Sequence, residues 1–497
     1  MSVFSVGPIR LEVEHRNPGA DGGPTLRVRD AERGREWLRF DCFASGGHWH
    51  LDPAGRDQIS PFEAGLDSLA WTLAQLRADC AGLLARAGFE AGALDPRALA
   101  GALDSVERAM RNPPVDLDAV RPSARRPSRG EKWTTYPDDV LPLWVADMDF
   151  PIAEPIRRVL RFAVERSDLG YPIHPAPTPI PDLTAARMQR LYGWSVAPER
   201  VEVLSDVVQG MYTAVHQFSE PGDGIVVQTP IYPPFLGSVA KQARRLDENP
   251  LALTARGYVI DLDALRRGTD ARTRILLLCN PHNPTGRAFR RDELEPLAAL
   301  AVERGWWVVA DEVHQDLVFP GHRHVPFASL GPEIAARTIT LTAASKAFNI
   351  AGLRCAVAIF GSDEAKRRFD ALPRHIRGGI GMLGIEALDA AWRDSEPWLD
   401  AVRAYLAANR AYVIDTVREE MPGVVLHPPE ATYLAWLDFR ALDLRPSPFA
   451  FFLEQAKVAL SDGATFGAPG RGFARINFAT SRAILSDALE RIAKALR

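Results

Sequence analysis

Three polar residues stand at the ends of successive apolar runs, and their types suit chemistry on an amine. Asn283, Asp311 and Lys346 are separated by about one strand-and-helix unit each. A lysine held in an apolar loop loses its proton more readily than one in water, so it can form a Schiff base with an aldehyde. The series therefore predicts a site for amine chemistry centred on Lys346.

Each of these residues is weak evidence when it is taken alone. A single Ser-Lys pair, here Ser345-Lys346, is more often ordinary surface. A single strand-end aspartate is more often a helix cap, and a single Asn-Pro is more often a turn. The prediction rests on the ordered series, because Asn283, Asp311 and Lys346 in that order are much less expected by chance.

The elements that must position these residues indicate an α/β fold with a mostly parallel sheet. Continuous apolar runs are typical of parallel strands buried on both faces, and helical patterns lie between the runs, as crossover connections require. Open sheets of this kind bind ligands at the carboxyl ends of their strands. The predicted strands are 201–204, 225–228, 275–279, 306–310 and a run ending near 341, with another over 143–150 that leads into a loop.

Two helices are also predicted, over 151–167 and 205–218. The second begins directly after a predicted strand. Its first free backbone amides, at Val207 and Val208, are suited to hold a phosphate group.

Residues 1–112 are predicted to form a separate small α+β domain, whose role the sequence does not indicate. Alternating apolar residues predict half-buried strands over 9–13, 38–42 and 48–51. A helix is expected to open at Pro61, carry an apolar stripe and end at Gly88, and a second helix is expected over 95–110. Residues 113–131 have the Pro, Arg and Ser content of a linker, and 132–497 form the predicted catalytic region.

His48 and His50 share one strand face with Asp52 in phase, so a metal site is conceivable there. We interpret the three as a polar solvent face opposite Trp49 and Leu51, because no further ligand has a suggestive spacing. The sequence therefore predicts no metal site.

Composition excludes several classes of function. The 497 residues have a net charge of −4, and residues 1–112 hold 13 Arg, no Lys and 16 acidic residues, whereas a DNA-binding head is expected to be basic. The four cysteines are scattered without a CxxC pair, which fits a reducing cytoplasm. No signal peptide and no membrane-spanning run is found, so we expect a cytoplasmic protein that binds neither nucleic acid nor membrane.

Several strings beyond the central series carry a resemblance to a known family. They are Lys132-Trp133, Trp144–Phe150 (WVADMDF), Gly170–Pro172 (GYP), Gln228–Phe235 (QTPIYPPF), Asn280–Gly286 (NPHNPTG), Asp311–Asp316 (DEVHQD), Ser345–Leu353 (SKAFNIAGL), Glu430–Trp436 (EATYLAW) and Arg475–Phe478 (RINF). Through them the segment 132–480 resembles fold-type I pyridoxal-phosphate (PLP) enzymes of the class I/II aminotransferase superfamily. Within it, the segment is similar to the MalY/PatB group of cystathionine, or cysteine-S-conjugate, β-lyases.

The resemblance implies roles at the ring of the cofactor. Lys346 would hold its aldehyde and later take the Cα proton of the substrate. Asp311 would pair with the pyridine nitrogen, which makes the ring an electron sink. Asn283 would donate to the ring's phenolate oxygen, and Tyr232 would lie over the ring face.

It also implies ligands at the two ends of the site. The amides of Val207 and Val208, with Ser345 and Arg354, would hold the phosphate, and Tyr171 would reach it from a second subunit. Many relatives carry Ser or Thr three residues before the lysine, where this chain has Ala343. The substrate carboxylate would be bound by Arg475, through two parallel hydrogen bonds, and by a backbone amide near Ala146.

The implied architecture is a large domain of about 170–390 and a small α/β domain of about 132–169 plus 391–497, assembled as a homodimer with the site at the interface.

Three activities stay open. A good leaving group on Cβ gives β-elimination to pyruvate, ammonia and a thiol; protonation at the cofactor carbon gives transamination instead. The third reading is a non-catalytic PLP-binding regulatory module, which the acidic N-terminal unit disfavours. We favour the β-lyase acting on an amino-acid substrate, because of the subgroup resemblance.

Overall fold

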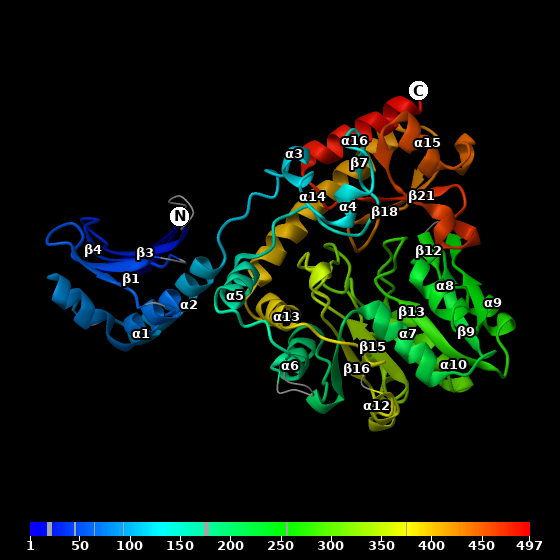
Figure 1. Ribbon diagram of the computed structural model, residues 1–497, viewed down its shortest axis with the longest axis horizontal. Helices are drawn as coiled ribbons and strands as arrows, with labels where there is room; N and C mark the ends of the chain where they lie inside the picture. The colour runs from blue at the N-terminus through cyan, green and yellow to red at the C-terminus, as the bar shows by residue number, and fades with distance from the viewer. Residues whose placement is uncertain are drawn as a thin grey trace. The chain divides into compact units, whose positions relative to one another are not determined.

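The chain folds into two compact units, Met1–Val115 and Asp116–Arg497 (Figure 1). The computed structural model describes residues 1–497 except 17–21, 44–45, 64, 93, 173–177, 255–256 and 374. The predicted fold class is confirmed, with an antiparallel α+β unit followed by a large and a small domain. Within the described part of the chain, no helix is long and apolar enough to cross a membrane.

The N-terminal unit is a six-stranded antiparallel meander covered on one face by two helices. Its elements are β1 (Ser2–Val6), β2 (Ile9–Arg16), β3 (Gly23–Asp30), β4 (Glu36–Asp41), β5 (His48–Leu51), β6 (Gln58–Pro61), α1 (Ser68–Ala87) and α2 (Pro96–Arg111). The three predicted strands and both helices are present, whereas β1, β3 and β6 were not predicted. Leu11, Leu26 and Phe40 lie in the core beneath the helices.

The predicted start of the first helix is wrong. Pro61 ends strand β6, and α1 begins only at Ser68, because Asp67 caps it by accepting hydrogen bonds from two first-turn amides. Leu66, assigned to the apolar stripe, is 38% exposed. The predicted end is right, since Gly88 closes the helix with a φ of 95°, a left-handed conformation that glycine adopts without strain.

The large domain holds a seven-stranded sheet in the order β10-β9-β13-β14-β15-β16-β8. The strands are β8 (Val201–Leu204), β9 (Gly224–Thr229), β10 (Arg245–Pro250), β13 (Thr273–Cys279), β14 (Trp307–Asp311), β15 (Thr338–Thr342) and β16 (Ala356–Phe360). Only β16 is reversed among them, pairing antiparallel with both β15 and β8, so the other six strands share one direction. Their carboxyl ends therefore meet at one edge.

Helices cover both faces of this sheet, as its continuous apolar strands require. Alternate residues of one strand face opposite cores: Leu277 packs with the α7 side and Leu276 with the α10 side. The helices of this part are α6 (Ile180–Tyr192), α7 (Val207–Phe218), α8 (Pro233–Ala240), α9 (Leu262–Gly268), α10 (Arg291–Arg304), α11 (Pro332–Ala335), α12 (Asp363–Asp370) and α13 (Met382–Asp394), with a hairpin of β11 (Ala252–Thr254) and β12 (Gly257–Val259).

The small domain is built on a second sheet, ordered β17-β18-β21-β20. Its strands are β17 (Val425–Leu426), β18 (Leu434–Asp438), β20 (Ser461–Asp462) and β21 (Phe473–Asn477), and its helices are α5 (Glu154–Glu165), α14 (Glu396–Glu420), α15 (Pro448–Gln455) and α16 (Arg482–Ala495). The short helices α3 (Pro122–Arg125) and α4 (Glu131–Thr134) precede the pair β7 (Leu141–Pro142) and β19 (Val458–Ala459). In Figure 1 this sheet and α16 lie above the large sheet.

The strand predicted over 143–150 is wrong, since β7 ends at Pro142. The stretch is instead an extended loop. The carbonyl of Leu143 accepts a hydrogen bond from the backbone amide of Asn477 at the end of β21, whereas the carbonyls that follow accept from side chains. Asn477 Nδ2 donates to the carbonyls of Val145 and Asp147, both at 2.7 Å. An alternation of apolar and polar residues cannot distinguish this arrangement from a strand edge.

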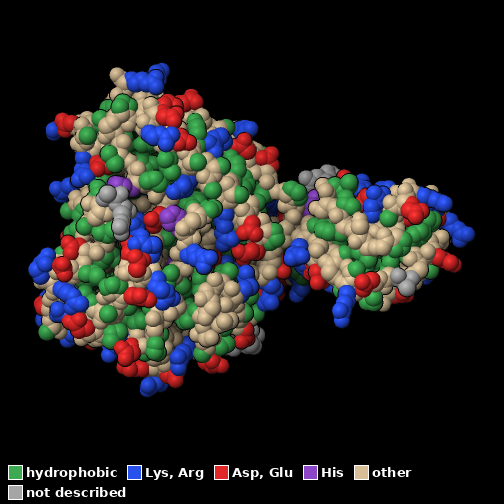
Figure 2. Space-filling view, turned by 180° about the vertical axis from the view of Figure 1, so that it is seen from behind, with side chains coloured by type: hydrophobic (Ala, Val, Ile, Leu, Met, Phe, Trp, Pro, Cys, Tyr) green, Lys and Arg blue, Asp and Glu red, His purple; other side chains and the backbone are tan. Residues whose placement is uncertain are grey.

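The stretch of linker composition belongs to the second unit from Asp116 onward, where hydrogen bonds hold it. Tyr405 donates a hydrogen bond to the Asp118 carboxylate at 2.6 Å, and Ser481 donates to the carbonyl of Val120 at 2.8 Å. The boundaries 1–112, 113–131 and 132–497 stay predictions, as do the limits of the large and small domains. On the face of the molecule in Figure 2, described acidic and basic side chains are interspersed.

Candidate active site

The predicted residues gather at the carboxyl edge of the large sheet. Asp311 is the last residue of β14, and Lys346 lies in the loop that follows β15. Asn283 follows β13, and Tyr232 follows β9 as the residue before α8. Because these four strands run in the same direction, their ends bring the four side chains to one place.

Lys346 is held at the centre of this edge by the loop that crosses it. Its Nζ donates a hydrogen bond to the carbonyl oxygen of Ala146 at 3.0 Å. Burial lowers the pKa of Lys346, Asp147 and Asp311 oppose that shift, and the positive charge of Arg475 adds to it. A lysine in these surroundings releases its proton more readily than a surface lysine, as nucleophilic and basic roles require.

Asp311 is a buried carboxyl group that lacks a cationic partner in direct contact. Its side chain accepts one hydrogen bond from the amide of Val313 at 3.1 Å, and burial raises its pKa to about 7. No ion pair to Asp311 is found among the described residues. A carboxyl group in this state favours a neighbouring cation, so it fits a protonated pyridine nitrogen.

Arg475 is a buried cation whose hydrogen bonds go to neutral groups. Its Nη1 donates to Asn283 Oδ1 at 2.7 Å, and its Nη2 donates to the carbonyl of Trp144 at 2.9 Å and to Ser461 at 3.1 Å. Its Nε has no hydrogen-bond partner, and burial lowers its pKa to about 10, so it stays charged at neutral pH. Such a guanidinium suits the carboxylate of a substrate.

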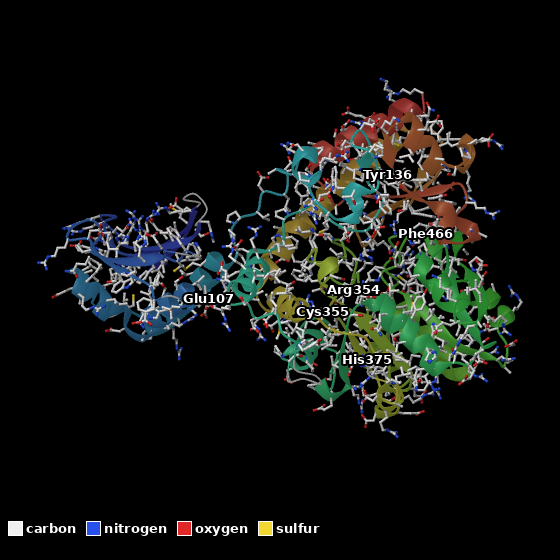
Figure 3. All side chains as sticks on the ribbon, in the orientation of Figure 1. Glu107, Tyr136, Arg354, Cys355, His375 and Phe466 are labelled. Carbon is white, nitrogen blue, oxygen red and sulfur yellow. The ribbon has the colours of Figure 1, made fainter. Side chains whose placement is uncertain are left out.

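The N-terminus of α7 forms the opposite end of the site. Asp206 caps the helix by accepting from the amide of Gln209 at 2.7 Å, while the first amides, at Val207 and Val208, have no partner within the helix. Arg354 (labelled in Figure 3) donates to the Asp206 carboxylate, so its guanidinium lies at this helix end. Amides and guanidinium together suit a phosphate.

Three other predicted residues have different placements. The amide of Tyr232 donates to the carbonyl of Asn283 at 3.2 Å, and burial raises the pKa of its phenol. Tyr171 is fully exposed and is not brought to the cluster, and Ser345 is partly exposed beside Lys346. The roles of all these residues toward a cofactor stay predictions, but their donors and charges fit PLP.

Two contributing residues were not singled out from the sequence. Tyr433 donates a hydrogen bond to the carbonyl oxygen of Ala146 at 2.8 Å. The same oxygen also accepts the hydrogen bond from Lys346. Asn349 accepts from the amide of Met148 at 3.2 Å and donates to the carbonyl of Phe150 at 2.8 Å. Both lie inside strings that carry the resemblance, and only the tertiary fold shows that they hold the loop 143–150.

Three polar residues inside the family strings, His282, His314 and Asp316, have surroundings typical of structural residues. Burial lowers the pKa of both histidines to about 3, so they are neutral at physiological pH. Asp316 forms a buried ion pair with Arg187 at 2.8 Å. These contacts are typical of structural residues, and none of them indicates that the three residues take part in catalysis.

Replacing Arg475 with lysine is expected to raise KM and lower kcat/KM about 10- to 100-fold. Lysine keeps the charge but loses the planar pair of donors, and one hydrogen bond to a charged group contributes about 1.5–3 kcal/mol. Steady-state kinetics of Arg475→Lys measure the effect. The exposed Arg471→Lys, four residues earlier, is the matched control. An unchanged KM would show that Arg475 does not bind the carboxylate.

Comparisons with known proteins agree with this geometry. The model of the aminotransferase class I and II family matches residues 166–492, and that of a domain of unknown function, DUF7700, matches residues 3–110. The chain is 39% identical over 361 residues to cystathionine β-lyase PatB of Bacillus subtilis, covering 72% of this chain and 93% of that protein. It is 36% identical over 368 residues to cystathionine β-lyase of Corynebacterium glutamicum, covering 73% and 96%. The PLP-bound C-S lyase of Staphylococcus hominis superposes with a TM-score of 0.72 at 30% identity, covering 77% and 98%.

Proposed function

The chain belongs to the class I and II aminotransferase family, and from this premise we propose that it is a PLP-dependent carbon–sulfur lyase. It cleaves cystathionine or another cysteine S-conjugate to pyruvate, ammonia and a thiol. The observation that carries the proposal is the cluster itself. Lys346, with a lowered pKa, interacts electrostatically with a buried carboxyl group, Asp311, and with a buried guanidinium whose hydrogen bonds go to neutral groups, Arg475.

Each residue of the site has a distinct role in the proposed α,β-elimination. Arg475 binds the substrate carboxylate and thereby points the Cα proton toward the lysine. Lys346 takes that proton, since burial favours its neutral form. Bound PLP supplies an electron sink for the charge that develops at Cα, and Asp311 is the group that keeps its ring nitrogen protonated. Asn283 and Tyr232 would hold the ring, and the N-terminus of α7 would hold the phosphate.

Transamination shares the proton transfer at Cα and differs only afterwards. An aspartate-type aminotransferase would use a second arginine for the side-chain carboxylate of its substrate. Among the described residues, the side chains that hydrogen-bond to Lys346, Asn283 or the carbonyl of Ala146 include one arginine, Arg475. This supports the lyase over that alternative.

Product analysis without an amino-group acceptor separates the two activities. The holoenzyme is incubated with L-cystathionine and with other S-substituted cysteines, and pyruvate, ammonia and free thiol are measured. Equal release of the three products in the absence of any 2-keto acid is the expected result. Turnover that depends strictly on an added keto acid would reject the lyase and favour the aminotransferase.

The enzyme is further proposed to be a cytoplasmic homodimer whose site is completed across the interface. Tyr171 is fully exposed, next to Leu169 at 56% exposure, as expected of a side chain that enters a partner's phosphate site. All four cysteines are free and buried, which suits a reducing compartment. Light scattering on the purified chain tests the assembly, and a fully active monomer would contradict it.

A further inference from the structure

Three side chains that commonly bind metals converge on the face of the N-terminal sheet opposite its helices. The antiparallel register of β4 and β5 places Asp41 directly across from His48, and Arg39 directly across from His50. Their neighbours Phe40 and Trp49 point to the core, so the two histidines and Asp41 share the outer face. Asp41 and His50 are only 1% and 2% exposed, although they lie on an uncovered face.

Two of the three separations between these groups match those of ligands around one small cation. The Nε2 atoms of His48 and His50 lie 3.4 and 3.5 Å from the same carboxylate oxygen, Asp41 Oδ2. Tetrahedral Zn²⁺ with bonds of about 2.0–2.1 Å to nitrogen and oxygen requires ligand atoms about 3.3–3.5 Å apart. All three ligand atoms lie within 4.8 Å of one another.

The other ring nitrogen of each histidine is bound to an oxygen acceptor. His48 Nδ1 donates to the carbonyl of Gly46 at 3.1 Å, and His50 Nδ1 donates to the Asp57 carboxylate at 2.5 Å. These bonds place the protons on Nδ1, so that both Nε2 atoms are acceptors. Metal-binding histidines are held in this way, with the distal N–H on a carboxylate or carbonyl.

A cation already sits against these groups. The guanidinium of Arg39 lies with Nη2 at 2.6 Å from His50 Nε2 and Nε at 3.1 Å from Asp41 Oδ2. The other oxygen, Asp41 Oδ1, accepts from Thr25 at 2.6 Å and pairs with Arg16 at 3.4 Å. The Arg39 side chain is 24% exposed, so it can turn into solvent and make room for a metal ion.

We propose that the N-terminal unit binds a late first-row divalent cation, with Zn²⁺ as the first choice, through Nε2 of His48, Nε2 of His50 and Oδ2 of Asp41. Two imidazoles and one carboxylate are ligands that Zn²⁺ prefers, and a tetrahedral ion keeps a fourth position for water or an external ligand. Arg39 competes with the metal for the same acceptors. The site is separate from the proposed lyase chemistry and gives the N-terminal unit a ligand of its own.

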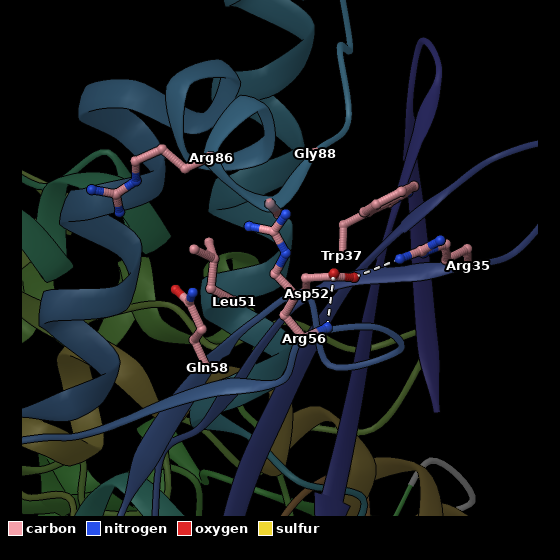
Figure 4. Close-up of a pocket in the computed structure, with 9 residues that line it drawn as sticks. Arg35, Trp37, Leu51, Asp52, Arg56, Gln58, Arg86 and Gly88 are labelled. Atoms are coloured by element: carbon pink, nitrogen blue, oxygen red, sulfur yellow. Dashed lines mark hydrogen bonds and ion pairs between the residues drawn. The ribbon is translucent and has the colours of Figure 1, made fainter.

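This site differs from the trio of His48, His50 and Asp52 that was weighed from the sequence and set aside in favour of a solvent-facing strand. The chain turns at Asp52 with a φ of 53°, so this side chain leaves the histidine face. It pairs with Arg35 at 2.7 Å and accepts from the amide of Arg56 at 3.0 Å, beside a pocket of about 290 Å³ (Figure 4). The third ligand comes from the neighbouring strand instead.

Zinc binding to the full-length holoenzyme tests the proposal. Protein freed of metal by a chelator and dialysis is titrated with Zn²⁺ against a chromophoric competitor, and one ion per chain is expected at this site. His48→Ala and His50→Ala each weaken binding at least about a hundredfold, and Asp57→Asn weakens it about 10- to 100-fold through its hydrogen bond to His50. Arg39→Ala strengthens binding, because it removes the competing cation. The exposed His216→Ala on α7 is the matched control and leaves binding unchanged.

Equal zinc uptake by the wild type and by the His48→Ala/His50→Ala double variant overturns the proposal, since the ion would then lie elsewhere. An Arg39→Ala variant that binds zinc no more tightly also counts against it. His48 has a side chain 30% exposed, so its replacement tests the site even where His50→Ala fails to fold. Co²⁺ in place of Zn²⁺ gives a second readout, because its visible absorption reports four-coordinate nitrogen and oxygen ligands.

Discussion

Lys346→Ala is expected to lower kcat for pyruvate release from L-cystathionine at least about 10⁴-fold. A positioned general base alone contributes about 10²–10⁴-fold, and this lysine is also the residue proposed to hold the cofactor aldehyde. Its Nζ lies 3.0 Å from the carbonyl of Ala146, and no other lysine among the described residues contacts this loop carbonyl. Pyruvate release measured over hours on protein supplied with excess PLP gives the residual rate.

A second measurement separates loss of the base from loss of the fold. Borohydride reduction is expected to attach the cofactor covalently to the wild-type chain and not to Lys346→Ala, as intact-mass spectrometry records. The exposed Lys241→Ala is the control and keeps wild-type activity. Full activity of Lys346→Ala, or covalent labelling of that variant, contradicts the assignment.

Asp311→Asn is expected to lower kcat about 10²- to 10⁴-fold while preserving the shape of the site. Removing one partner of a buried charge pair costs about 3–5 kcal/mol, and each 1.36 kcal/mol is a factor of ten in rate. The amide cannot hold the ring nitrogen in its protonated form, so the electron sink weakens. Kinetics with saturating PLP measure the fall, and the exposed Asp363→Asn is the control.

The same substitution is expected to stabilise the cofactor-free protein. Burial raises the pKa of Asp311 from 3.8 to about 7, so the folded state holds this proton more tightly than the unfolded state. Below pH 3.8 both states are protonated and the group contributes nothing; the cost of its ionisation then grows with pH and is complete above pH 7. It amounts to about 2 kcal/mol at pH 5.5 and about 4 kcal/mol at pH 8.

Denaturant unfolding of cofactor-free wild type and Asp311→Asn at the two pH values measures this difference. The advantage of the variant should be larger at pH 8 than at pH 5.5 and should shrink when PLP is restored, since the cofactor supplies the missing cation. A pH-independent difference between the two proteins would show that Asp311 does not titrate in this range.

The sequence could predict the residues at the strand ends because their position follows from chain direction alone. A parallel sheet brings the ends of its strands to one edge, so Asn283, Asp311 and Lys346 had to lie close together once the strands were identified. The antiparallel direction of β16 does not change this grouping, because β16 lies between β15 and β8 and carries none of the predicted residues.

Contacts between distant segments could not be predicted in this way. The loop 143–150 was taken for a strand because its carbonyl partners, Arg475 and Asn477, lie more than 300 residues away in the chain. The grouping of Asp41 with His48 depends on the register between two strands, which the spacing within one strand does not reveal. Asp52 was considered beside the two histidines because it is in phase along the strand, although the backbone turns at Asp52.

The loop 143–150 is fastened at its two ends to different parts of the molecule. At its start the carbonyl of Trp144 is bound by Arg475 and Ser461, and at its end Met148 and Phe150 are bound by Asn349, three residues after Lys346. The segment thus joins Arg475, the residue proposed to bind the substrate carboxylate, to the loop that carries Lys346. The backbone segment that contacts Lys346 is therefore the same one that Arg475 binds, and only a few peptide bonds separate the two contacts.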